Sequence, residues 1–327
     1  MCLFHGVAMK TYKHLFESIV TFETLHTSLL RARAGKRSKG EVARFEYDLE
    51  RNLFDLQREL QDGSYQPGAY RHFYIREPKR RKISAAPFRD RVVHHALCSA
   101  IMPIWEQRFI HNSFACRVGK GTHRALDRAQ DYARRHCYVL QADIVQFFPS
   151  IDHTVLRGLL AHRIADPRVM ALIDRLLASG AGVLDSEYSM QWFPGDTLLA
   201  PLDRARGLPI GNLTSQFWAN VYLHELDTFV AQELRVGSYV RYADDVLLFG
   251  DDKAQLHAQR AAISVFLERL RLVPHDRKTQ VYPVASGIPF LGFHLYPDRR
   301  RLKRPSIIRF KRRMRSLLAT YSESQNG

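Results

Sequence analysis

Three aspartates in apolar surroundings are the residues of this sequence best placed to do chemistry. Asp143 ends the run CYVLQAD that begins at residue 137, and Asp244 and Asp245 separate two apolar arms in SYVRYADDVLLFG. Adjacent carboxylates at the tip of a hairpin repel one another and lose solvation, so the arrangement needs a cause. Binding of divalent cations, which prefer oxygen ligands, supplies one.

The three carboxylates converge if the strand that ends at Asp143 lies beside the Asp244-Asp245 hairpin in one sheet. They could then hold two Mg²⁺ ions roughly 3.5–4 Å apart, for which Mn²⁺ could substitute. Such a pair of ions activates a 3′-hydroxyl and stabilises a pyrophosphate leaving group. The alternative is that ADD is an ordinary polar turn, where aspartate is common. The position of Asp143 in an apolar strand favours the metal site.

The composition predicts a folded protein with a polyanionic partner. The chain has 327 residues, of which 46% are hydrophobic and 11% aromatic, enough for two or three lobes with a sizeable core. Lys and Arg number 49 against 33 Asp and Glu, which gives a net charge of +16. Nucleic acid is the expected partner, because the basic residues do not form the one long amphipathic helix that would favour a membrane surface.

The sequence also indicates where the protein works. Its apolar runs are too short to span a bilayer, and its first residues, MCLFHGVAMK, lack the pattern of a signal peptide. The four cysteines are scattered without a CxxC pair, which argues against a zinc knuckle and a disulfide framework. We therefore expect a location in a reducing cytoplasm and no contact with membranes.

Helical and strand patterns surround the aspartates on both sides. Arg71 to Ile75 and the segment ISAAP predict two strands on either side of the basic tip EPKRRK. GIPFLGFHLYP is expected to be a strand pair or tight hairpin, and residues 181–206 a loop or hairpin insertion. The spacing predicts helices over 12–30, 41–60, 154–180 and 253–271, with two more that begin near Asp90 and Phe217.

The tail from Arg299 to Arg315 carries ten Lys or Arg and no acid. Within it, a helix over 306–318 would place Arg309, Arg312 and Arg313 along one broad face, with Ile308 and Leu317 nearer the other. We expect this helix to follow the backbone of a nucleic-acid duplex. A solvated basic helix is the alternative.

The order of motifs resembles that of reverse transcriptases of the bacterial retroelement type. YADD is similar to their YxDD motif, and ADIVQFFPSID to the segment that carries their first catalytic aspartate. RKISAAPFRDRVVHHAL resembles the fingers motif, FACRVGKGTHRA a template-contacting motif, HDRKTQ a lysine-bearing motif and GIPFLGFHLYP the primer grip. The resemblance covers roughly residues 65 to 315 in the family's order.

This resemblance implies an α+β fold built as a right-hand polymerase. The palm would be an antiparallel sheet backed by helices, and the thumb would be short and helical. The implied parts are an N-terminal helical segment at 1–64, fingers at 65–136, a palm at 137–298 that contains the 181–206 insertion, and a basic thumb at 299–327 that is expected to be short or truncated.

The resemblance also implies a role for individual residues. Asp143, Asp244 and Asp245 would be catalytic metal ligands, and Lys278 the general acid for pyrophosphate, with an exposed surface lysine as the alternative. The implied nucleotide-binding residues are Lys79, Arg81, Phe148, Ile210, Gly211 and Gln216. The implied nucleic-acid-binding residues are Arg117, Lys120, Leu291, Gly292, Lys303, Arg309, Arg312 and Arg313.

Phe148 falls where the family keeps a steric gate against ribonucleotides. A bulky ring under the sugar would clash with a 2′-hydroxyl, so deoxynucleotides should be preferred. Phe147 is expected to point the other way and pack into the core. The alternative for both rings is a purely structural role.

The segment Ile210-Gly211-Asn212-Leu213-Thr214-Ser215-Gln216 departs from the common QGxxxSP pattern. IGxxxSQ resembles the enzymes of diversity-generating retroelements, which copy a template RNA with frequent errors opposite adenine. A glutamine can hydrogen-bond the sugar and the neighbouring pair, whereas Ile210 cannot. Loss of one such contact is worth about 1–3 kcal/mol of discrimination. Ile210 could instead be a packed apolar residue.

The expected function is therefore RNA-directed DNA synthesis with two Mg²⁺ ions, error-prone in a diversity-generating retroelement. The alternatives are a reverse transcriptase of antiphage defence or of a CRISPR-associated locus, and a non-catalytic RNA-binding scaffold on a polymerase fold. A group II intron maturase is less favoured than these settings, since no maturase extension follows the expected thumb. The expected partners are template RNA, a primer and RNA–DNA duplex, dNTPs, a small basic accessory protein and a structured non-coding RNA, in a bacterial or phage-encoded system.

Overall fold

The computed structural model describes residues 10–76 and 80–325. They form two compact units, and each is built from several stretches of the chain. The first contains the described residues within Met1–Ile110, Val145–Thr228 and Val265–Val273, and the second those within His111–Ile144, Phe229–Ser264 and Pro274–Gly327. The expected fingers, palm and thumb are functional parts of a polymerase, whereas the two units are defined by compactness. The units therefore do not test the expected boundaries, which stay a prediction.

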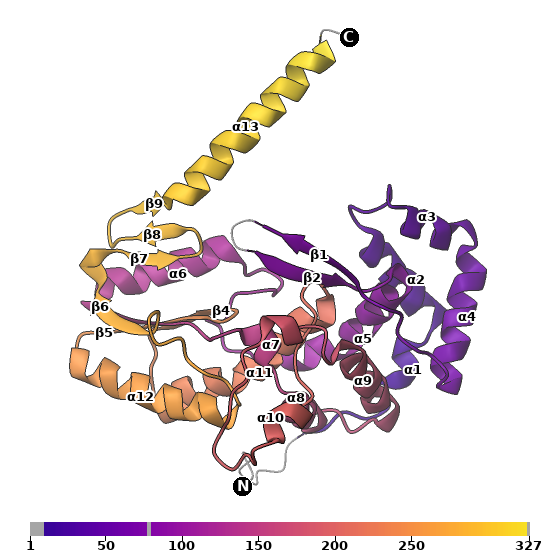
Figure 1. The fold of residues 1–327 in the computed structure, drawn as a ribbon, viewed down its shortest axis with the longest axis horizontal. Helices are drawn as coiled ribbons and strands as arrows, with labels where there is room; N and C mark the ends of the chain where they lie inside the picture. Colours follow the sequence, from indigo (N-terminus) through magenta and orange to yellow (C-terminus); the bar gives the residue numbers. More distant parts are fainter. Residues whose placement is uncertain (1–9, 77–79, 326–327) are drawn as a thin grey trace. The chain divides into compact units, whose positions relative to one another are not determined.

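The first unit is mostly helical and is organised around α5 (Phe88–Glu106). This helix packs against α1 (Phe16–Ile19), α2 (Phe22–Arg33), α3 (Gly40–Tyr47) and α11 (Leu213–Thr228) (Figure 1). Burial of more than half of its side chains explains why it lacks a strongly polar face. Other helices of the unit are α4 (Leu49–Asp62), α7 (Phe147–Ser150), α8 (His153–Ala161), α9 (Pro167–Gly180), a 3₁₀ turn at Asp185–Glu187, and α10 (Ala200–Asp203).

A two-stranded antiparallel sheet projects from the first unit. It pairs β1 (Arg71–Ile75) with β2 (Arg81–Ala85), with Phe73 opposite Ile83. The two strands predicted around the basic tip are therefore confirmed, although β2 begins two residues earlier than predicted, at Arg81, and ends at Ala85. Residue Lys79, at that tip, lies outside the described residues.

The second unit holds a four-stranded antiparallel sheet in the order β4-β5-β3-β6. The strands are β3 (Tyr138–Ala142), β4 (Tyr239–Tyr242), β5 (Asp245–Gly250) and β6 (Gln280–Pro283). One face of the sheet packs on α6 (Thr122–Arg135) and on a small sheet of β7 (Ile288–Phe290), β8 (Phe293–Leu295) and β9 (Arg300–Leu302) (Figure 1). The core on that face includes Leu126, Val139, Val240, Leu247, Phe290 and Leu295.

Two further helices belong to this part of the chain. α12 (Lys253–Arg269) contributes residues to both units, and α13 (Arg304–Gln325) follows β9 in the second. The mixture of helices with antiparallel sheets confirms the α+β class. Among the described residues, no helix has both the length and the apolar character that crossing a membrane requires.

Three helices predicted as continuous are each interrupted. Residues 12–30 form α1 and α2, residues 41–60 form α3 and α4, and residues 154–180 form α8 and α9. The last break has a clear cause, because Asp166 caps α9 by accepting hydrogen bonds from the N–H groups of Arg168 and Val169, and Pro167 is the first residue of the helix.

Candidate active site

The three aspartates lie at one edge of the four-stranded sheet, within the second unit. β3 and β5 are antiparallel neighbours whose last pair is Ala142 with Val246, so Asp143 and Asp245 follow directly in this register. Asp245 also pairs with Tyr242 across the β4–β5 hairpin, whose loop is Ala243 and Asp244. All three carboxylate residues are half-buried. The expectation that the two strands are neighbours is confirmed.

A buried arginine on strand β4, Arg241, stabilises the hairpin loop that carries Asp244. Arg241 has no exposed surface, and its Nη1 donates to the carbonyl oxygen of Ala243 over 3.1 Å. Ala243 has φ +55°, a left-handed conformation that costs a non-glycine residue about 1–2 kcal/mol. The arginine thus supports the one strained residue of the loop, next to Asp244.

Hydrogen bonds tie the same hairpin to the segment before α6. The Arg241 N–H donates to the carbonyl of Asn112 over 2.9 Å, and the Phe114 N–H donates to the carbonyl of Arg241 over 3.0 Å. The hydroxyl groups of Tyr242 and Thr122 are 3.1 Å apart. These contacts fix the position of the hairpin within the unit. We did not predict Arg241 from the sequence, since an arginine beside two aspartates reads as a surface charge.

Lys278, the predicted general acid, lies beside Asp143. Its Nζ forms an ion pair with Oδ2 of Asp143. The turn that carries it is anchored next to the same residue, because the His275 N–H donates to the Asp143 carbonyl over 2.8 Å and the Lys278 N–H to the His275 carbonyl over 3.0 Å. The Lys278 side chain stays 46% exposed, so it can reach groups in solvent as well as Asp143.

The chemistry of these residues suits Mg²⁺, which prefers carboxylate and water oxygens over nitrogen or sulfur. Three carboxylates at one sheet edge supply such ligands. Within residues 10–76 and 80–325, however, no three His, Cys, Asp or Glu side chains are arranged closely enough to form a ready metal cage. The Lys278 ion pair occupies one oxygen of Asp143. Metal binding by Asp143, Asp244 and Asp245 stays a prediction.

Within the first unit, the segment Ile210-Gly211-Asn212 is hydrogen-bonded to the end of strand β2. The Ser84 N–H donates to the carbonyl of Ile210 over 2.9 Å, and the Asn212 side chain bonds both Ser84 and Ala86. Gly211 has φ +113°, and a Cβ there would lie 2.9 Å from Cγ2 of Ile83. Only glycine fits this approach, which explains the Gly in the motif.

The other expected nucleotide-binding residues differ in exposure. Arg81 opens β2 and is exposed, as are Gly211 and Gln216, whereas Ile210 is half-buried. Phe147 is buried and Phe148 half-buried, as expected, with ring centroids 5.4 Å apart. The reasoning behind that expectation was wrong, because the two rings lie on the short helix α7 rather than on a strand. Nucleotide binding by these residues stays a prediction.

Arg117 and Lys120 lie in the second unit, in the loop before α6. Nη1 of Arg117 donates to the Ser113 carbonyl over 2.9 Å, and Nζ of Lys120 to the His111 carbonyl over 2.8 Å. Lys120 borders a pocket of about 190 Å³ whose walls are His111, Phe114, Lys120, Arg124, Asp127, Arg128 and Asp131. The basic groups of this loop thus shape its backbone, and binding to template is an expectation that the geometry leaves open.

Leu291 and Gly292 form the two-residue turn between β7 and β8. Both have positive φ, +45° and +88°, as a type I′ turn requires, so the predicted tight hairpin is confirmed. The turn is joined to the start of α13, because the Lys303 N–H donates to the Gly292 carbonyl over 2.9 Å. The predicted basic helix is also confirmed, although it is longer than expected. It carries Arg309, Arg312 and Arg313.

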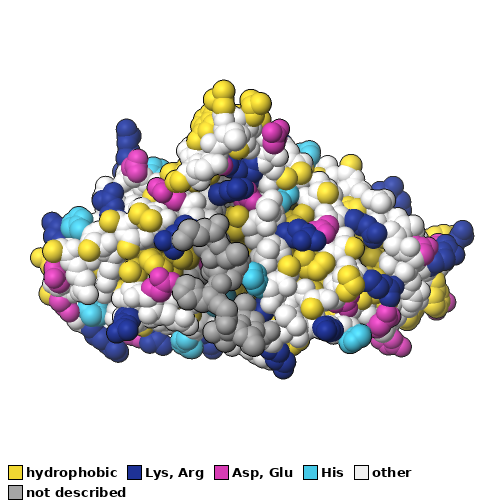
Figure 2. All heavy atoms as spheres, turned by 90° about the horizontal axis from the view of Figure 1, so that it is seen from below, with side chains coloured by type: hydrophobic (Ala, Val, Ile, Leu, Met, Phe, Trp, Pro, Cys, Tyr) yellow, Lys and Arg dark blue, Asp and Glu magenta, His cyan; other side chains and the backbone are white. Residues whose placement is uncertain are grey.

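Figure 2 shows the distribution of charged side chains on one face of the molecule. On this face Lys and Arg are scattered among Asp and Glu instead of forming one patch. The concentration of ten basic residues between Arg299 and Arg315 is therefore the more specific electrostatic signal for a nucleic-acid partner.

Comparison with known proteins decides the family. Residues 75–295 match the family described as reverse transcriptase (RNA-dependent DNA polymerase). The chain belongs to the reverse transcriptase family. The match contains the sheet, all three aspartates, Lys278 and the Leu291-Gly292 turn. Template RNA, a growing DNA strand, dNTPs and divalent metal ions are the substrates and cofactors of this family.

Individual reverse transcriptase relatives are similar over different lengths. Protein YkfC of Escherichia coli K12 is 28% identical over 289 residues, which cover 75% of this chain and 71% of that protein. The group II intron-encoded protein LtrA of Lactococcus lactis is 30% identical over 186 residues, 56% of this chain but only 29% of LtrA. Nuclear intron maturase 2 of Arabidopsis thaliana is 26% identical over 144 residues, 39% of this chain and 20% of that protein.

Proposed function

We propose that this reverse transcriptase synthesises cDNA on an RNA template by nucleotidyl transfer at two Mg²⁺ ions. The observation that carries the proposal is the placement of Asp143, Asp244 and Asp245 at one edge of an antiparallel sheet. Asp143 and Asp244 would be the principal ligands. The bound ions would lower the pKa of the primer 3′-hydroxyl and neutralise charge on the leaving pyrophosphate.

The residues of the chain itself take the other parts of the reaction. Lys278, beside Asp143, would donate a proton to pyrophosphate as it leaves. Arg81, exposed at the start of β2, would bind the triphosphate, together with Lys79. Phe148 would exclude ribonucleotides. The basic helix α13 would follow the backbone of the RNA–DNA duplex.

A primer-extension assay tests the polymerase proposal. The protein is given a primed RNA template, Mg²⁺ and four dNTPs, and the Asp244→Ala/Asp245→Ala variant serves as control. We expect Mg²⁺-dependent extension by the wild-type protein only. A protein that binds the RNA tightly but extends nothing with either Mg²⁺ or Mn²⁺ would instead be an RNA-binding scaffold.

We further propose that synthesis is error-prone and belongs to a diversity-generating retroelement. The support is the segment Ile210 to Gln216, in which an apolar residue takes the place of the usual glutamine. A structured template RNA and a small basic accessory protein would be the partners in this setting. Errors concentrated opposite template adenine in sequenced cDNA are the expected result, and evenly scattered errors would contradict it.

Two other settings are alternatives, of which only the first has support from a relative. Similarity to the group II intron-encoded protein LtrA favours an intron-linked retroelement, and antiphage defence or a CRISPR-associated locus would use the same polymerase. The neighbouring genes separate the settings. A template repeat with a variable repeat marks the diversity-generating element, and intron RNA domains around the gene mark the intron.

A further inference from the structure

The segment that carries Phe148 is hydrogen-bonded along its length to the end of the 181–206 insertion and the residues just after it. The Leu208 N–H donates to the Phe148 carbonyl over 2.9 Å, the Gly207 N–H to the Ile151 carbonyl over 2.9 Å, and the His153 N–H to the Ala205 carbonyl over 3.0 Å. These bonds lie within the first unit. The backbone of Phe148 is thus fixed by residues far along the chain.

A second connection holds the residue at which α7 begins. Gln146 has φ +46° and ψ +46°, a left-handed conformation that is costly for a residue other than glycine. Its side-chain amide is bonded in both directions to Ser189, since Oε1 accepts from the Ser189 N–H over 2.8 Å and Nε2 donates to Ser189 Oγ over 3.2 Å. The insertion thus supports the strained residue two positions before Phe148.

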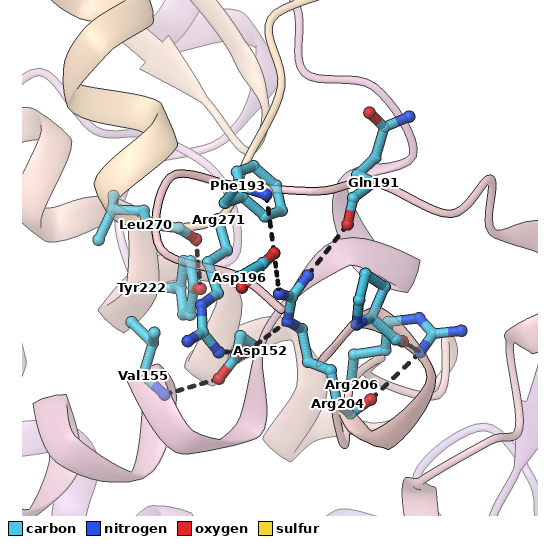
Figure 3. A network of polar contacts seen from close by, with 11 residues as sticks. Asp152, Val155, Gln191, Phe193, Asp196, Arg204, Arg206, Tyr222, Leu270 and Arg271 are labelled. Atoms are coloured by element: carbon cyan, nitrogen blue, oxygen red, sulfur yellow. Dashed lines mark hydrogen bonds and ion pairs between the residues drawn. The ribbon is translucent and has the colours of Figure 1, made fainter. Parts of the chain in front are cut away.

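The insertion is itself anchored by a network of charges that is buried except at Arg271, whose side chain is 37% exposed (Figure 3). Arg204 contacts Asp196 over 2.5 Å through Nη2 and Asp152 over 3.5 Å through Nε, and Arg271 contacts Asp152 over 2.5 Å. The side chain of Asp152 is fully buried, and those of Asp196 and Arg204 are 7% and 5% exposed. Figure 3 shows Asp152 between Arg204 and Arg271, which come from different segments of the chain.

Every charge of this network has an opposite charge beside it, as buried ions require. Two further hydrogen bonds join the network, because Arg204 Nη1 donates to the Gln191 carbonyl over 3.2 Å and Asp196 accepts from the Phe193 N–H over 2.7 Å. Buried ion pairs add little stability compared with apolar packing, and their best-attested use is to select one arrangement of the chain. In this protein the ion pairs join Asp196 and Arg204 of the insertion to Asp152 and Arg271.

We propose that residues 189–208, the insertion clamp, position the Phe148 ring and so determine how strongly the enzyme rejects ribonucleotides. Gln146, Ser189 and Arg204 are positioning residues in this proposal, since they act through Phe148. The proposal rests on the polymerase function proposed above and adds a role for the insertion. Its physical basis is that displacement of a discriminating group by about 1 Å changes rates by up to a hundredfold.

The test compares kcat/KM for dCTP and for rCTP in single-nucleotide primer extension. Gln146→Ala removes both bonds to Ser189, and Ser189→Ala removes only the one to the hydroxyl. Ser186→Ala, at an exposed serine in the same insertion, is the matched control. Phe148→Ala measures the full effect of losing the ring.

We expect Phe148→Ala to relax the preference for dCTP most strongly and Gln146→Ala to relax it by about tenfold. Ser189→Ala should have a smaller effect and Ser186→Ala none. The conservative variant Gln146→Glu keeps the acceptor for the Ser189 N–H, so it should restore part of the preference. A merely structural role would lower the use of both nucleotides equally and would lower Tm.

Two results would overturn the inference. One is an unchanged preference in Gln146→Ala alongside a relaxed preference in Phe148→Ala, and the other is an unchanged preference in Phe148→Ala itself. Failure of the wild-type protein to extend with dCTP would overturn the polymerase function, which the first two results leave intact. Arg204→Lys keeps the buried charge and serves as the test of the network, since Arg204→Ala risks unfolding the unit.

Discussion

Arg241 donates from Nη1 to the carbonyl oxygen of Ala243 over 3.1 Å, from a side chain with no exposure to solvent. A buried guanidinium beneath a strained loop residue is a means of holding Asp244 in place. We predict that Arg241→Met, which keeps much of the side-chain volume, lowers kcat of primer extension by about tenfold or more. The reason is that a small displacement of Asp244 at the reacting centre would slow the chemical step. RNA binding, measured by filter retention, should change much less.

The same substitution should also destabilise the second unit, since it leaves the Ala243 carbonyl without its donor. A loss of about 1–3 kcal/mol is expected from urea unfolding. Arg241→Lys is the control, because it keeps the charge but not the planar donor group. Full activity in Arg241→Met would show that the hairpin holds its shape without help.

Asp143→Asn preserves size and removes charge from the proposed metal site. We expect a loss of roughly a hundredfold or more in extension rate, with higher Mg²⁺ needed for half-maximal activity. Asp251→Asn is the matched control at an exposed aspartate that bonds His136 at the other end of the sheet. Equal activity of the two variants would contradict the assignment of Asp143.

Lys278 can act by donating a proton or by neutralising Asp143, and two substitutions separate these roles. Lys278→Arg keeps the positive charge beside Asp143 but is a poor proton donor, and Lys278→Ala loses both. If proton donation matters, both variants should lose roughly 10²–10⁴-fold in the chemical step, measured by rapid quench. If Lys278→Arg is nearly as fast as wild type, the ion pair is the main function.

Ile210→Gln should increase the fidelity of cDNA synthesis. The added amide could hydrogen-bond the sugar and the neighbouring base pair, which corresponds to about 1–3 kcal/mol of discrimination. Deep sequencing of products on an adenine-rich template measures the change, with Ile210→Leu as the size-matched control. An identical error spectrum in all three proteins would remove Ile210 from the account of selectivity.

The buried imidazole of His94 should make the stability of the folded protein depend on pH. Burial, with smaller effects from His95 and Arg91, lowers the pKa of His94 to about 3 from an ordinary value of 6.5. The folded protein therefore keeps the ring neutral while the unfolded chain takes up a proton below pH 6.5, so the free energy of unfolding falls as pH drops from about 6.5 toward 3. When the pH falls from 7 to 5, this group alone should lower the free energy of unfolding by about 2 kcal/mol.

Urea unfolding at those two pH values, compared with His94→Leu, isolates this contribution. The variant should lose less stability on acidification than the wild type, whatever its stability at pH 7. The other histidine on the same helix, His95, is unchanged in both proteins and cancels in the comparison. Parallel pH dependence of the two proteins would contradict the prediction.

The sequence predicted those parts of the site that depend on neighbouring residues. Asp143 and the Asp244-Asp245 pair are placed by apolar strands on their own segments, and the Leu291-Gly292 turn by its own short hairpin. Arg241 and the insertion clamp were missed, because their partners, such as Asn112 for Arg241 and Asp152 for Arg204, come from distant segments. The break before α9 did have a local signal, the Asp166-Pro167 pair, which the helical spacing around it concealed.

The junction between the Leu291-Gly292 turn and α13 fixes the direction in which the helix leaves the hairpin. The helix has 22 residues and is therefore about 33 Å long. Its first turn is held at the hairpin by the Lys303–Gly292 hydrogen bond, and Ser306 Oγ lies 3.4 Å from the same carbonyl. A rotation of about 10° at this point would move the far end of the helix through about 6 Å. A small change at the Gly292 carbonyl, which accepts both bonds, would therefore displace the end of the helix much more than the turn itself.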